Sequence, residues 1–233
     1  MSVLSGKPEA LGRVPLEPLV RGKERLRHRW RAPLSSFVVP MVHEKRSLRR
    51  ALRERRGSLC LSARRRGARA VARRGCRLLR RTKRVGAYLP HGSELDPRPL
   101  MRALTRLGCM VYLPVIGRQP HSPLSFLPYR PPLARNRYGI MEPRWGRRLR
   151  GSQLDVVLVP LLGFDQRGFR LGQGGGHYDR TFAFSSRKRH AKPCLIGVAF
   201  ECQQVAQLPT GVHDVRLHLV LTENRLYRAR RML

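Results

Sequence analysis

The chain has 233 residues, 41% of them hydrophobic, so it is long enough for one α/β domain with a sizeable core or for two small domains. No apolar stretch approaches the roughly 20 residues of a membrane span, and the N-terminus lacks the apolar block of a secretory signal, so we expect a cytoplasmic protein. The formal net charge of +35 favours a polyanionic partner such as nucleic acid, but 43 of the 49 basic residues are arginine, a skew that coding bias in a GC-rich gene also produces.

Residues 1–40 are expected to form an extension that buries little. Prolines recur in this stretch, its charges are mixed, and no hydrophobic period is sustained. Met41 stands directly before a well-patterned helix, so one hypothesis is that the natural start is Met41. On this interpretation residues 41–233 form a single domain, and a chain beginning at Met41 folds and functions normally.

Residues 44–84 are almost continuously helix-forming and strongly basic. They contain eighteen Lys or Arg residues against two acidic ones, Glu44 and Glu54. A thin apolar face suffices for one or two helices packed against a sheet, and the expected breaks are Gly57, Gly67 and Gly75. Such a basic surface is either an ordinary solvated face or an anion-binding one, and the sequence leaves both open.

Alternating elements follow. Residues 85–89 predict a strand, 90–93 a turn, 97–107 a helix and 110–115 a second strand, which together make a right-handed βαβ unit with parallel strands. A hairpin-like segment near residues 124–129 and a proline-rich passage at 138–143 come next. Further strands are expected at 154–162, 195–200 and 217–221, with a helix from about residue 178. This alternation predicts an α/β fold, a three-layer α/β/α sandwich around a largely parallel, Rossmann-like sheet.

The run from Arg170 to Asp179 is the most informative stretch for function. Its sequence, RLGQGGGHYD, places four glycines behind the β-branched apolar run LDVVLVPLL at residues 154–162. Glycines let backbone N–H groups approach phosphate oxygens, and a loop at the carboxyl end of a buried strand is where α/β sheets bind ligands. The pattern is neither a P-loop nor a dinucleotide fingerprint, and a plain glycine-rich turn before a helix is the alternative.

Five motifs in order give the chain a family resemblance. They are KRSLR at residues 45–49, AYLP at 87–90 followed by Glu94, YGIMEP at 138–143, the segment from Val159-Pro160 to Asp179, and HDV at 213–215. In this order and spacing the chain, from about Lys45 to Thr222, resembles the 5-formyltetrahydrofolate cyclo-ligase (methenyltetrahydrofolate synthetase) family.

The resemblance implies an ATP-dependent ring closure with magnesium as cofactor. In that reaction the formyl oxygen of 5-formyltetrahydrofolate takes the γ-phosphoryl group of ATP, and a neighbouring folate amine displaces phosphate to give 5,10-methenyltetrahydrofolate. Catalysis of this kind depends on positioning and electrostatics, so no covalent nucleophile is needed, and the sequence offers no Ser-His-Asp or Cys-His set. A polyglutamylated folate is a further expected partner.

The resemblance also implies roles for individual residues. The expected metal ligands are Asp179 and Asp214. The expected folate contacts are His91, Glu94, Tyr138, Glu142 and Tyr178. The expected ATP contacts are Lys45, Arg46, Ser47, Leu48, Arg49, Arg170, Leu171, Gly172, Gln173, Gly174, Gly175, Gly176, His177 and Tyr178. Taken without the family, the same residues are compatible with basic-helix charges, a glycine turn and capping aspartates.

Three departures from the family pattern are visible. His177 stands where an aromatic residue such as tyrosine is common, His218 stands where many members have aspartate, and the arginine surplus between Arg64 and Arg84 exceeds what the chemistry requires. One explanation of the surplus is steering of polyanionic substrates. The alternative function is RNA binding by a catalytically silent α/β domain, although few aromatic residues interrupt the basic stretch to stack on bases.

The cysteines carry no functional pattern. No two of them form a CxxC pair, and no histidine stands in zinc-finger register, so they are interpreted as buried small residues and not as a zinc site or a disulfide framework. They are Cys60, Cys76, Cys109, Cys194 and Cys202.

Overall fold

The computed structural model describes residues 35–117, 119, 121–136, 139–187 and 192–229, with side chains from His43 onward. Its centre is an eight-stranded sheet in the order β12-β11-β10-β7-β1-β2-β3-β6. Neighbouring strands from β11 to β2 pair in parallel, and β12, β3 and β6 pair antiparallel at the two edges. The expected α/β fold with a largely parallel sheet is confirmed.

The parallel strands are β1 (Arg84–Gly86), β2 (Met110–Val115), β7 (Val156–Pro160), β10 (Cys194–Val198) and β11 (Leu219–Leu221). The edge strands are β3 (Ser125–Pro128), β6 (Leu149–Arg150) and β12 (Leu226–Arg228). From β1 the chain moves outward to β2 and later returns to β7 on the other side of β1. The strand order therefore reverses between β1 and β7, and such a reversal opens a crevice at the carboxyl ends of the strands.

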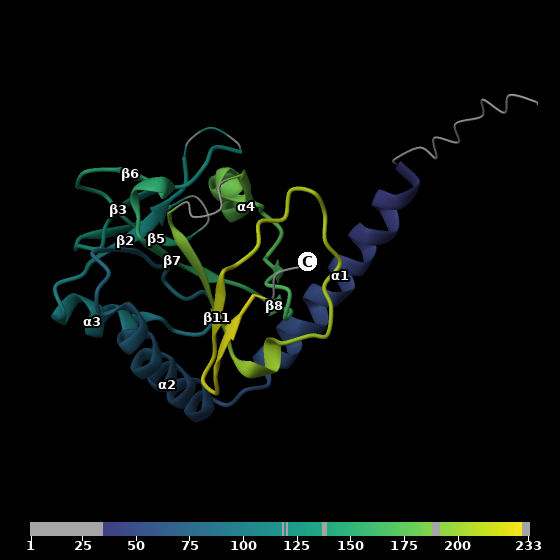
Figure 1. Ribbon diagram of the computed structural model, residues 1–233, viewed down its shortest axis with the longest axis horizontal. Helices are drawn as coiled ribbons and strands as arrows, with labels where there is room; N and C mark the ends of the chain where they lie inside the picture. Colours follow the sequence, from purple (N-terminus) through teal and green to yellow (C-terminus); the bar gives the residue numbers. More distant parts are fainter. Residues whose placement is uncertain (1–34, 118, 120, 137–138, 188–191, 230–233) are drawn as a thin grey trace, which may run out of the picture.

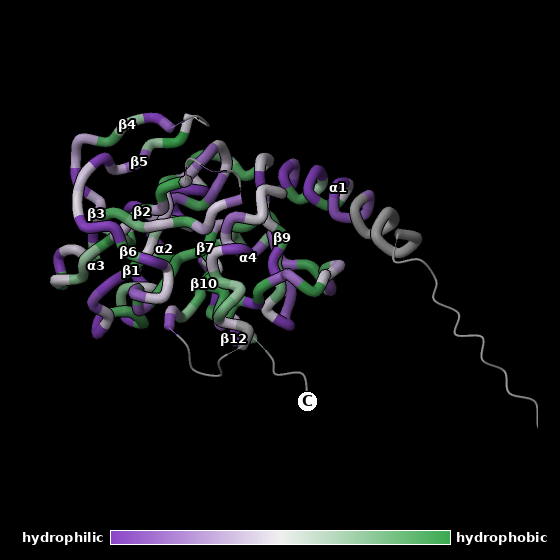
Figure 2. Tube along the Cα trace, turned by 90° about the horizontal axis from the view of Figure 1, so that it is seen from above, coloured by the Kyte–Doolittle hydropathy of each residue, from purple (hydrophilic) through white to green (hydrophobic). Residues whose placement is uncertain are grey.

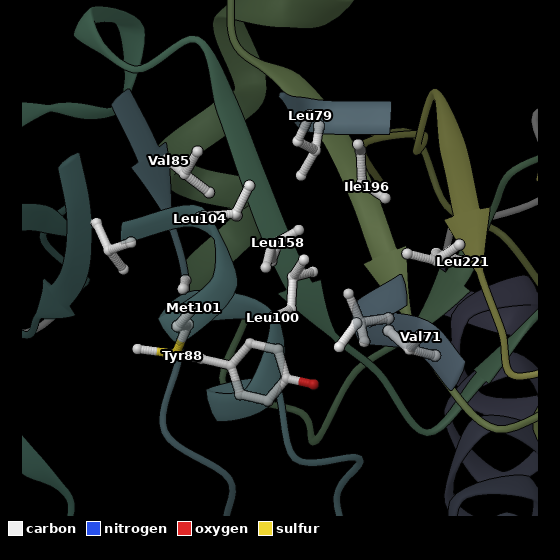
Figure 3. Packing of buried hydrophobic residues seen from close by; sticks show 14 of the residues in the cluster. Val71, Leu79, Val85, Tyr88, Leu100, Met101, Leu104, Leu158, Ile196 and Leu221 are labelled. Atoms are coloured by element: carbon white, nitrogen blue, oxygen red, sulfur yellow. The ribbon is translucent and has the colours of Figure 1, made fainter. Parts of the chain in front are cut away.

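Helices α2 (Leu61–Leu79) and α3 (Arg98–Arg106) lie together on one face of the sheet (Figure 1). Their apolar sides meet the strands in the largest hydrophobic cluster, in which Val71, Leu100 and Leu104 face Leu158 and Ile196 (Figure 3). Fully buried strands such as β7 are apolar on both faces, and this explains the unbroken run in its sequence.

The opposite face has a thinner cover. The short helix α4 (His177–Phe182) packs there with Phe182 against Phe126, and the short 3₁₀ helices at Gly151–Gln153 and Ala183–Arg187 lie beside it. A further 3₁₀ helix, Glu201–Gln203, contacts α1, and its Cys202 packs against the cluster on the α2 side. Two small hairpins project from the sheet. One pairs β4 (Leu133–Arg135) with β5 (Met141–Pro143), and the other pairs β8 (Gly163–Phe164) with β9 (Arg170–Leu171).

Helix α1 (Ser35–Gly57) runs past the β8 hairpin and extends beyond the body of the molecule (Figures 1 and 2). It is anchored by Leu52, which packs into a third cluster with Leu162, Leu171 and Leu208. The hydropathy colouring shows the coloured part of α1 as mostly hydrophilic beside an apolar sheet centre (Figure 2). The helix is continuous across residue 40, and the rest of the expected extension, residues 1–34, lies outside the described residues.

Two expected helix breaks are wrong. Gly57 ends α1 as predicted, but Gly67 and Gly75 lie inside α2. A Cβ on Gly67 would meet Phe200 at 2.8 Å, and one on Gly75 would meet Leu100 at 2.7 Å. These glycines therefore serve close packing of α2 against its neighbours. The expectation that the cysteines are buried is wrong for Cys60, which is exposed, and is confirmed for Cys109, which is buried.

No helix in the described part of the chain is both long and apolar enough to cross a membrane. The elements that the sequence did not predict are short. They are the two hairpins and strands β6 and β12, with two or three residues per strand, and the short 3₁₀ helices. Such strands are too brief to show a hydrophobic period.

Candidate functional site

A cavity of about 660 Å³ lies at the carboxyl ends of β1 and β7. This is the size of a small-molecule site, and it occupies the crevice where the strand order reverses. Segments distant in sequence line it: α1, the loop after β1, the end of β2, the β5 hairpin, residues 170–179, and Asp214. The fold thus brings together most of the residues that the sequence singled out.

The glycine run forms the part of the cavity suited to an anion. Gly174 and Gly176 have positive φ values of +114° and +62°, which other residues adopt only with strain. Arg49 Nε donates to the carbonyl of Gly172 at 3.0 Å, and the Arg180 guanidinium donates to the carbonyl of Gly175 at 2.6 Å. Among the described residues, the N–H groups of residues 173–176 donate to no protein acceptor. The loop therefore turns its carbonyls to arginines and keeps backbone donors for a ligand.

Helix α1 adds two cations on one side. Lys45 and Arg49 are one helical turn apart, so both point into the cavity. Lys45 Nζ lies 2.7 Å from Asp214 Oδ2, and this oxygen also accepts the N–H of Gly211 at 2.8 Å. The ammonium is thus fixed at the cavity wall by a residue 169 positions away.

Arg170 and Asp179 form a second, more buried ion pair. The Arg170 guanidinium is only 5% exposed and donates to Asp179 Oδ1 at 2.7 Å and to the carbonyl of Val215. Asp179 Oδ1 also accepts the N–H of Val215 at 3.1 Å. These bonds tie the start of α4 to the segment that carries Asp214, so the two expected metal ligands line one cavity.

The two carboxylates suit a magnesium ion in their donor chemistry. Within the described part of the chain no cluster of three or more His, Cys, Asp or Glu side chains could hold a metal. Asp179 Oδ2 and Asp214 Oδ1 nevertheless have no hydrogen-bond partner among the described residues, so each carboxylate keeps one oxygen available. Mg²⁺ is commonly held by one or two carboxylates plus substrate phosphates, and the residues present fit that pattern.

The loop after β1 carries Glu94 into the cavity. Glu94 Oε2 accepts the backbone N–H of His91 at 3.1 Å, and Oε1 lies 3.4 Å from the amide nitrogen of Gln173 in the glycine run. Arg56 supports this loop from α1 by donating to Ser93 Oγ at 3.0 Å and to the carbonyl of Leu161 at 3.3 Å. Burial lowers the pKa of the Arg56 guanidinium, and the nearby Glu94 carboxylate opposes that shift.

Glu142 lines the cavity from β5 and is already bonded to protein. Its Oε1 accepts the N–H of Ile116 at 3.0 Å and the amide of Asn136 at 2.6 Å. These bonds fasten the β4–β5 hairpin to the end of β2. Apolar side chains beside Glu142, including Leu113, Ile140 and Met141, form a wall on this side of the cavity.

Two tyrosines, Tyr88 and Tyr178, line the cavity. Tyr178 is half-buried and stacks on Phe182 with a centroid distance of 6.2 Å, and burial raises the pKa of its phenol. Tyr88 is buried, donates to the carbonyl of Leu95 at 2.8 Å, and has a raised pKa for the same reason. Both phenols stay neutral near neutral pH, so they offer hydrogen bonds and ring surface but no charge.

Three of the expected ATP contacts do not line the cavity. Arg46, Ser47 and Leu48 are outside the cavity lining, because residues between Lys45 and Arg49 point away from it around the helix; Leu48 packs against the core beside Leu52. Tyr138 lies outside the described residues. His218 is remote from the cavity: its Nδ1 accepts the N–H of Leu195 at 2.9 Å, and burial lowers its pKa.

Sequence reasoning missed several supporting residues. Asp165 is 1% exposed and holds the β8–β9 turn by accepting N–H groups of Arg167, Phe169 and Leu208. Thr181 accepts the N–H of Leu124 at 2.8 Å and so joins α4 to the hairpin region. An aspartate two residues before a bonded N–H is a local turn signal that could have identified Asp165, whereas nothing local marks Thr181.

Comparison with known proteins decides the family. The sequence profile of the 5-formyltetrahydrofolate cyclo-ligase family matches residues 41–223. The chain belongs to this family. It is 41% identical over 147 residues to the 5-formyltetrahydrofolate cyclo-ligase of Escherichia coli, covering 61% of this chain and 79% of that protein. The enzyme of the same name from Haemophilus influenzae is 33% identical over 186 residues, covering 77% of this chain and 98% of that protein.

Solved structures agree with the assignment to the cyclo-ligase family. The 5,10-methenyltetrahydrofolate synthetase of Aquifex aeolicus is 27% identical with a TM-score of 0.65, and the match covers 81% of this chain and 94% of that one. A Mycoplasma pneumoniae 5,10-methenyltetrahydrofolate synthetase has a TM-score of 0.62 at 21% identity, covering 77% and 99% of the two chains, a likeness that concerns the fold alone.

Proposed function

We propose that this cyclo-ligase family member catalyses the ATP- and magnesium-dependent cyclisation of 5-formyltetrahydrofolate to 5,10-methenyltetrahydrofolate, with release of ADP and phosphate. The observation that carries the proposal is one cavity with two chemically different sides. Free backbone N–H groups, Lys45 and Arg49 lie on one side, and an apolar wall with Glu94 lies on the other. A polyphosphate and a flat, hydrogen-bonding folate require such neighbouring surfaces.

The polyphosphate is assigned to the glycine run. Its backbone donors, together with Lys45 and Arg49, surround phosphate oxygens with positive potential in a partly enclosed site. Lys45 holds Asp214 at 2.7 Å, so the ammonium is already oriented before nucleotide binds. Helix α4 has only six residues, so we assign its dipole a minor part beside the loop donors.

The reaction transfers a phosphoryl group and then closes a ring. The formyl oxygen attacks the γ-phosphorus as the bond to ADP breaks, and the neighbouring folate amine then attacks the formyl carbon. Phosphate leaves with the bonding electrons of the carbon–oxygen bond, and the amine loses its proton. The chain supports these steps by holding both substrates in line and by stabilising the charge on the moving phosphoryl oxygens.

Magnesium would be held by the free oxygens of Asp179 and Asp214. When bound, it would neutralise charge on the nucleotide phosphates. The ion pairs to Arg170 and Lys45 hold both carboxylates in place at the cavity, and removal of either partner would leave a carboxylate with fewer fixed contacts.

Folate binding is assigned to the side formed by the loop after β1 and the β5 hairpin. Glu94 offers a carboxylate to N–H donors of a pterin ring, and Tyr178 offers a neutral ring and hydroxyl. Glu142 has one oxygen engaged by Ile116 and Asn136, so we propose that its main contribution is the position of the hairpin. His91 is assigned to the rim of the same side.

The competing function, RNA binding by a catalytically silent domain, is distinguished by the cavity itself. A silent domain has no need of the glycine loop, the α1 cations and both aspartates in one cavity. The enzymatic function is therefore the stronger proposal, and nucleic-acid binding by another surface is compatible with it.

An absorbance assay for the methenyl product tests the proposal with 5-formyltetrahydrofolate and MgATP. We expect product from the parent chain and a loss of roughly 100-fold or more in Asp179→Ala, since removal of one electrostatic contact in a transition-state site has that order of effect. Glu54→Ala, which removes an exposed carboxylate paired with Arg50, serves as the matched control and should retain activity. Product formation that needs neither ATP nor magnesium would reject the mechanism.

A further inference from the structure

The outer face of α2 carries a row of arginines that the proposed catalysis does not use. Arg66, Arg69, Arg73, Arg77 and Arg80 are all exposed. Their spacing of three or four residues keeps them within one side of the helix, opposite the buried residues that face the sheet. From Arg66 to Arg80 the row extends about 21 Å along the helix axis.

These charges are not neutralised within the protein. In the part of the chain that the structure describes, none of the five guanidinium groups takes part in an ion pair. The sequence has no acidic residue between Glu54 and Glu94, and α2 has none in its first turn. Like charges at this spacing destabilise a helix, and no ion pair among the described residues offsets that repulsion.

Helix α3 extends the same surface. Arg102 and Arg106 are exposed and lie one turn apart on the helix that packs beside α2. The carboxylate nearest in sequence, Asp96, is held by Arg98 at 2.8 Å. The outer side of the α2–α3 layer is therefore cationic on both helices. We call it the basic face, and it is defined by Arg66, Arg69, Arg73, Arg77, Arg80, Arg102 and Arg106.

We propose that the basic face binds the phosphate backbone of a duplex nucleic acid without selecting bases. Guanidinium groups bind phosphate oxygens in a fork geometry, and a rigid row suits a regularly spaced backbone. Neither α2 nor α3 contains an aromatic residue, so stacking on unpaired bases has no platform here. A duplex, whose bases are already stacked, does not require one.

An anionic membrane fits the basic face less well. Helices that bind membrane surfaces insert an apolar side between lipid headgroups. The apolar side of α2 is instead occupied by the sheet and α3, with Val71 at 0% and Leu79 at 3% exposure. The leucines that reach the surface of this layer stand singly, with Leu61 at 62%, Leu78 at 39% and Leu107 at 50% exposure.

Fluorescence anisotropy with the full chain tests the proposal, using labelled 20-base-pair duplexes of RNA and of DNA. We expect binding to both at 50 mM salt and a steep loss as salt rises, because counterion release gives a slope of about −0.9 for each neutralised phosphate on B-DNA. The joint change Arg66→Gln, Arg69→Gln, Arg73→Gln and Arg77→Gln should weaken binding at 100 mM salt at least about tenfold and reduce the DNA slope by about 3 to 4.

A matched control distinguishes the effect of losing the basic face from the effect of lowering the net charge of the protein. Arg130→Gln, Arg144→Gln, Arg147→Gln and Arg150→Gln remove the same formal charge from exposed positions near the β3–β6 edge of the sheet, on neither α2 nor α3. This control should keep most of the affinity and slope. Equal weakening in both variants, or no duplex binding by the parent chain at 50 mM salt, would overturn the proposal.

Two further measurements keep the outcome clear. Hydrogen exchange on the parent chain with duplex present should show protection across residues 61–81. Protection of other segments with none at residues 61–81 would contradict the assignment. Vesicles containing anionic phospholipid provide the alternative surface, and tighter binding to them than to either duplex would replace the proposed partner. Because the basic face lies outside the cavity lining, both quadruple variants should retain cyclo-ligase turnover, so a failure here is distinguishable from failure of the proposed catalysis.

Discussion

Arg56 shows how one buried side chain can organise a site that it does not line. Its guanidinium is 3% exposed and joins α1 to Ser93 and to the carbonyl of Leu161 at the end of β7. Burying a cation destabilises a fold unless its donors are hydrogen-bonded, and Arg56 is bonded at the point where the loop after β1 meets the end of β7. The geometry makes Arg56 a positioning residue for the loop that carries Glu94.

We expect Arg56→Gln to raise the KM for 5-formyltetrahydrofolate about tenfold while changing the KM for ATP much less. Loss of the bonds to Ser93 and Leu161 should loosen the loop on the proposed folate side of the cavity, but it leaves the glycine run bonded to Arg49. One or two hydrogen bonds correspond to a change in affinity of about tenfold. Steady-state kinetics with each substrate varied in turn provide the measurement.

The adjacent Arg55→Gln is the control, since Arg55 is exposed and its side chain makes a single 3.4 Å contact, to the carbonyl of Cys202, among the residues that the structure describes. Equal changes in both KM values in Arg56→Gln would indicate a general structural defect and contradict the positioning role.

At the scale of elements, α2 illustrates how packing overrides helix propensity. Glycine is unfavourable in a helix interior by about 1 kcal/mol relative to alanine, yet α2 contains Gly67 and Gly75 on its buried side. Each lets the helix approach a bulky side chain, Phe200 in one case and Leu100 in the other. Close approach of α2 and α3 to each other and to the sheet is thus obtained at the expense of local stability.

Gly75→Ala should therefore destabilise the fold by about 1–3 kcal/mol, because the new methyl group would lie 2.7 Å from Leu100 and 3.2 Å from Leu221. Gly57→Ala at the end of α1 is the matched control: no atom lies within 4 Å of its added Cβ, and its effect should be neutral or stabilising by up to about 1 kcal/mol. Urea unfolding measures both. A stabilised Gly75→Ala protein would mean that helix propensity outweighs the close contact.

At the scale of the whole molecule, the cavity exists only because distant segments converge. Lys45 meets Asp214 across 169 positions, Arg49 meets Gly172 across 123, and Gln173 approaches Glu94 across 79. A ligand that filled this cavity would touch α1, the loop after β1 and the glycine run together. We propose that residues 41–233 contain everything this assembly needs, in keeping with the family match from residue 41.

Nucleotide binding should accordingly stabilise the entire domain. A non-hydrolysable ATP analogue with Mg²⁺ at about 100 times its Kd should add about 2.7 kcal/mol, which corresponds to a rise in Tm of about 5–10 °C for a domain of this size. In Lys45→Met the shift at the same analogue concentration should be clearly smaller, because the ammonium is one of the cations assigned to phosphate. Thermal melting followed by circular dichroism measures this effect, and an unchanged Tm in the parent chain would contradict nucleotide binding.

The family, the parallel strands and the glycine run could be predicted from sequence because each depends on residues close together in the chain. A buried strand such as β7 needs a continuous apolar run, and a backbone anion site needs consecutive glycines. The tertiary structure alone decided which residues from Lys45 to Arg49 face the cavity, that Gly67 and Gly75 are packing contacts, and that Arg56 supports the loop that carries Glu94. Those outcomes depend on contacts between segments far apart along the chain, and the spacing of residues in the sequence does not show which distant segment the fold will bring near.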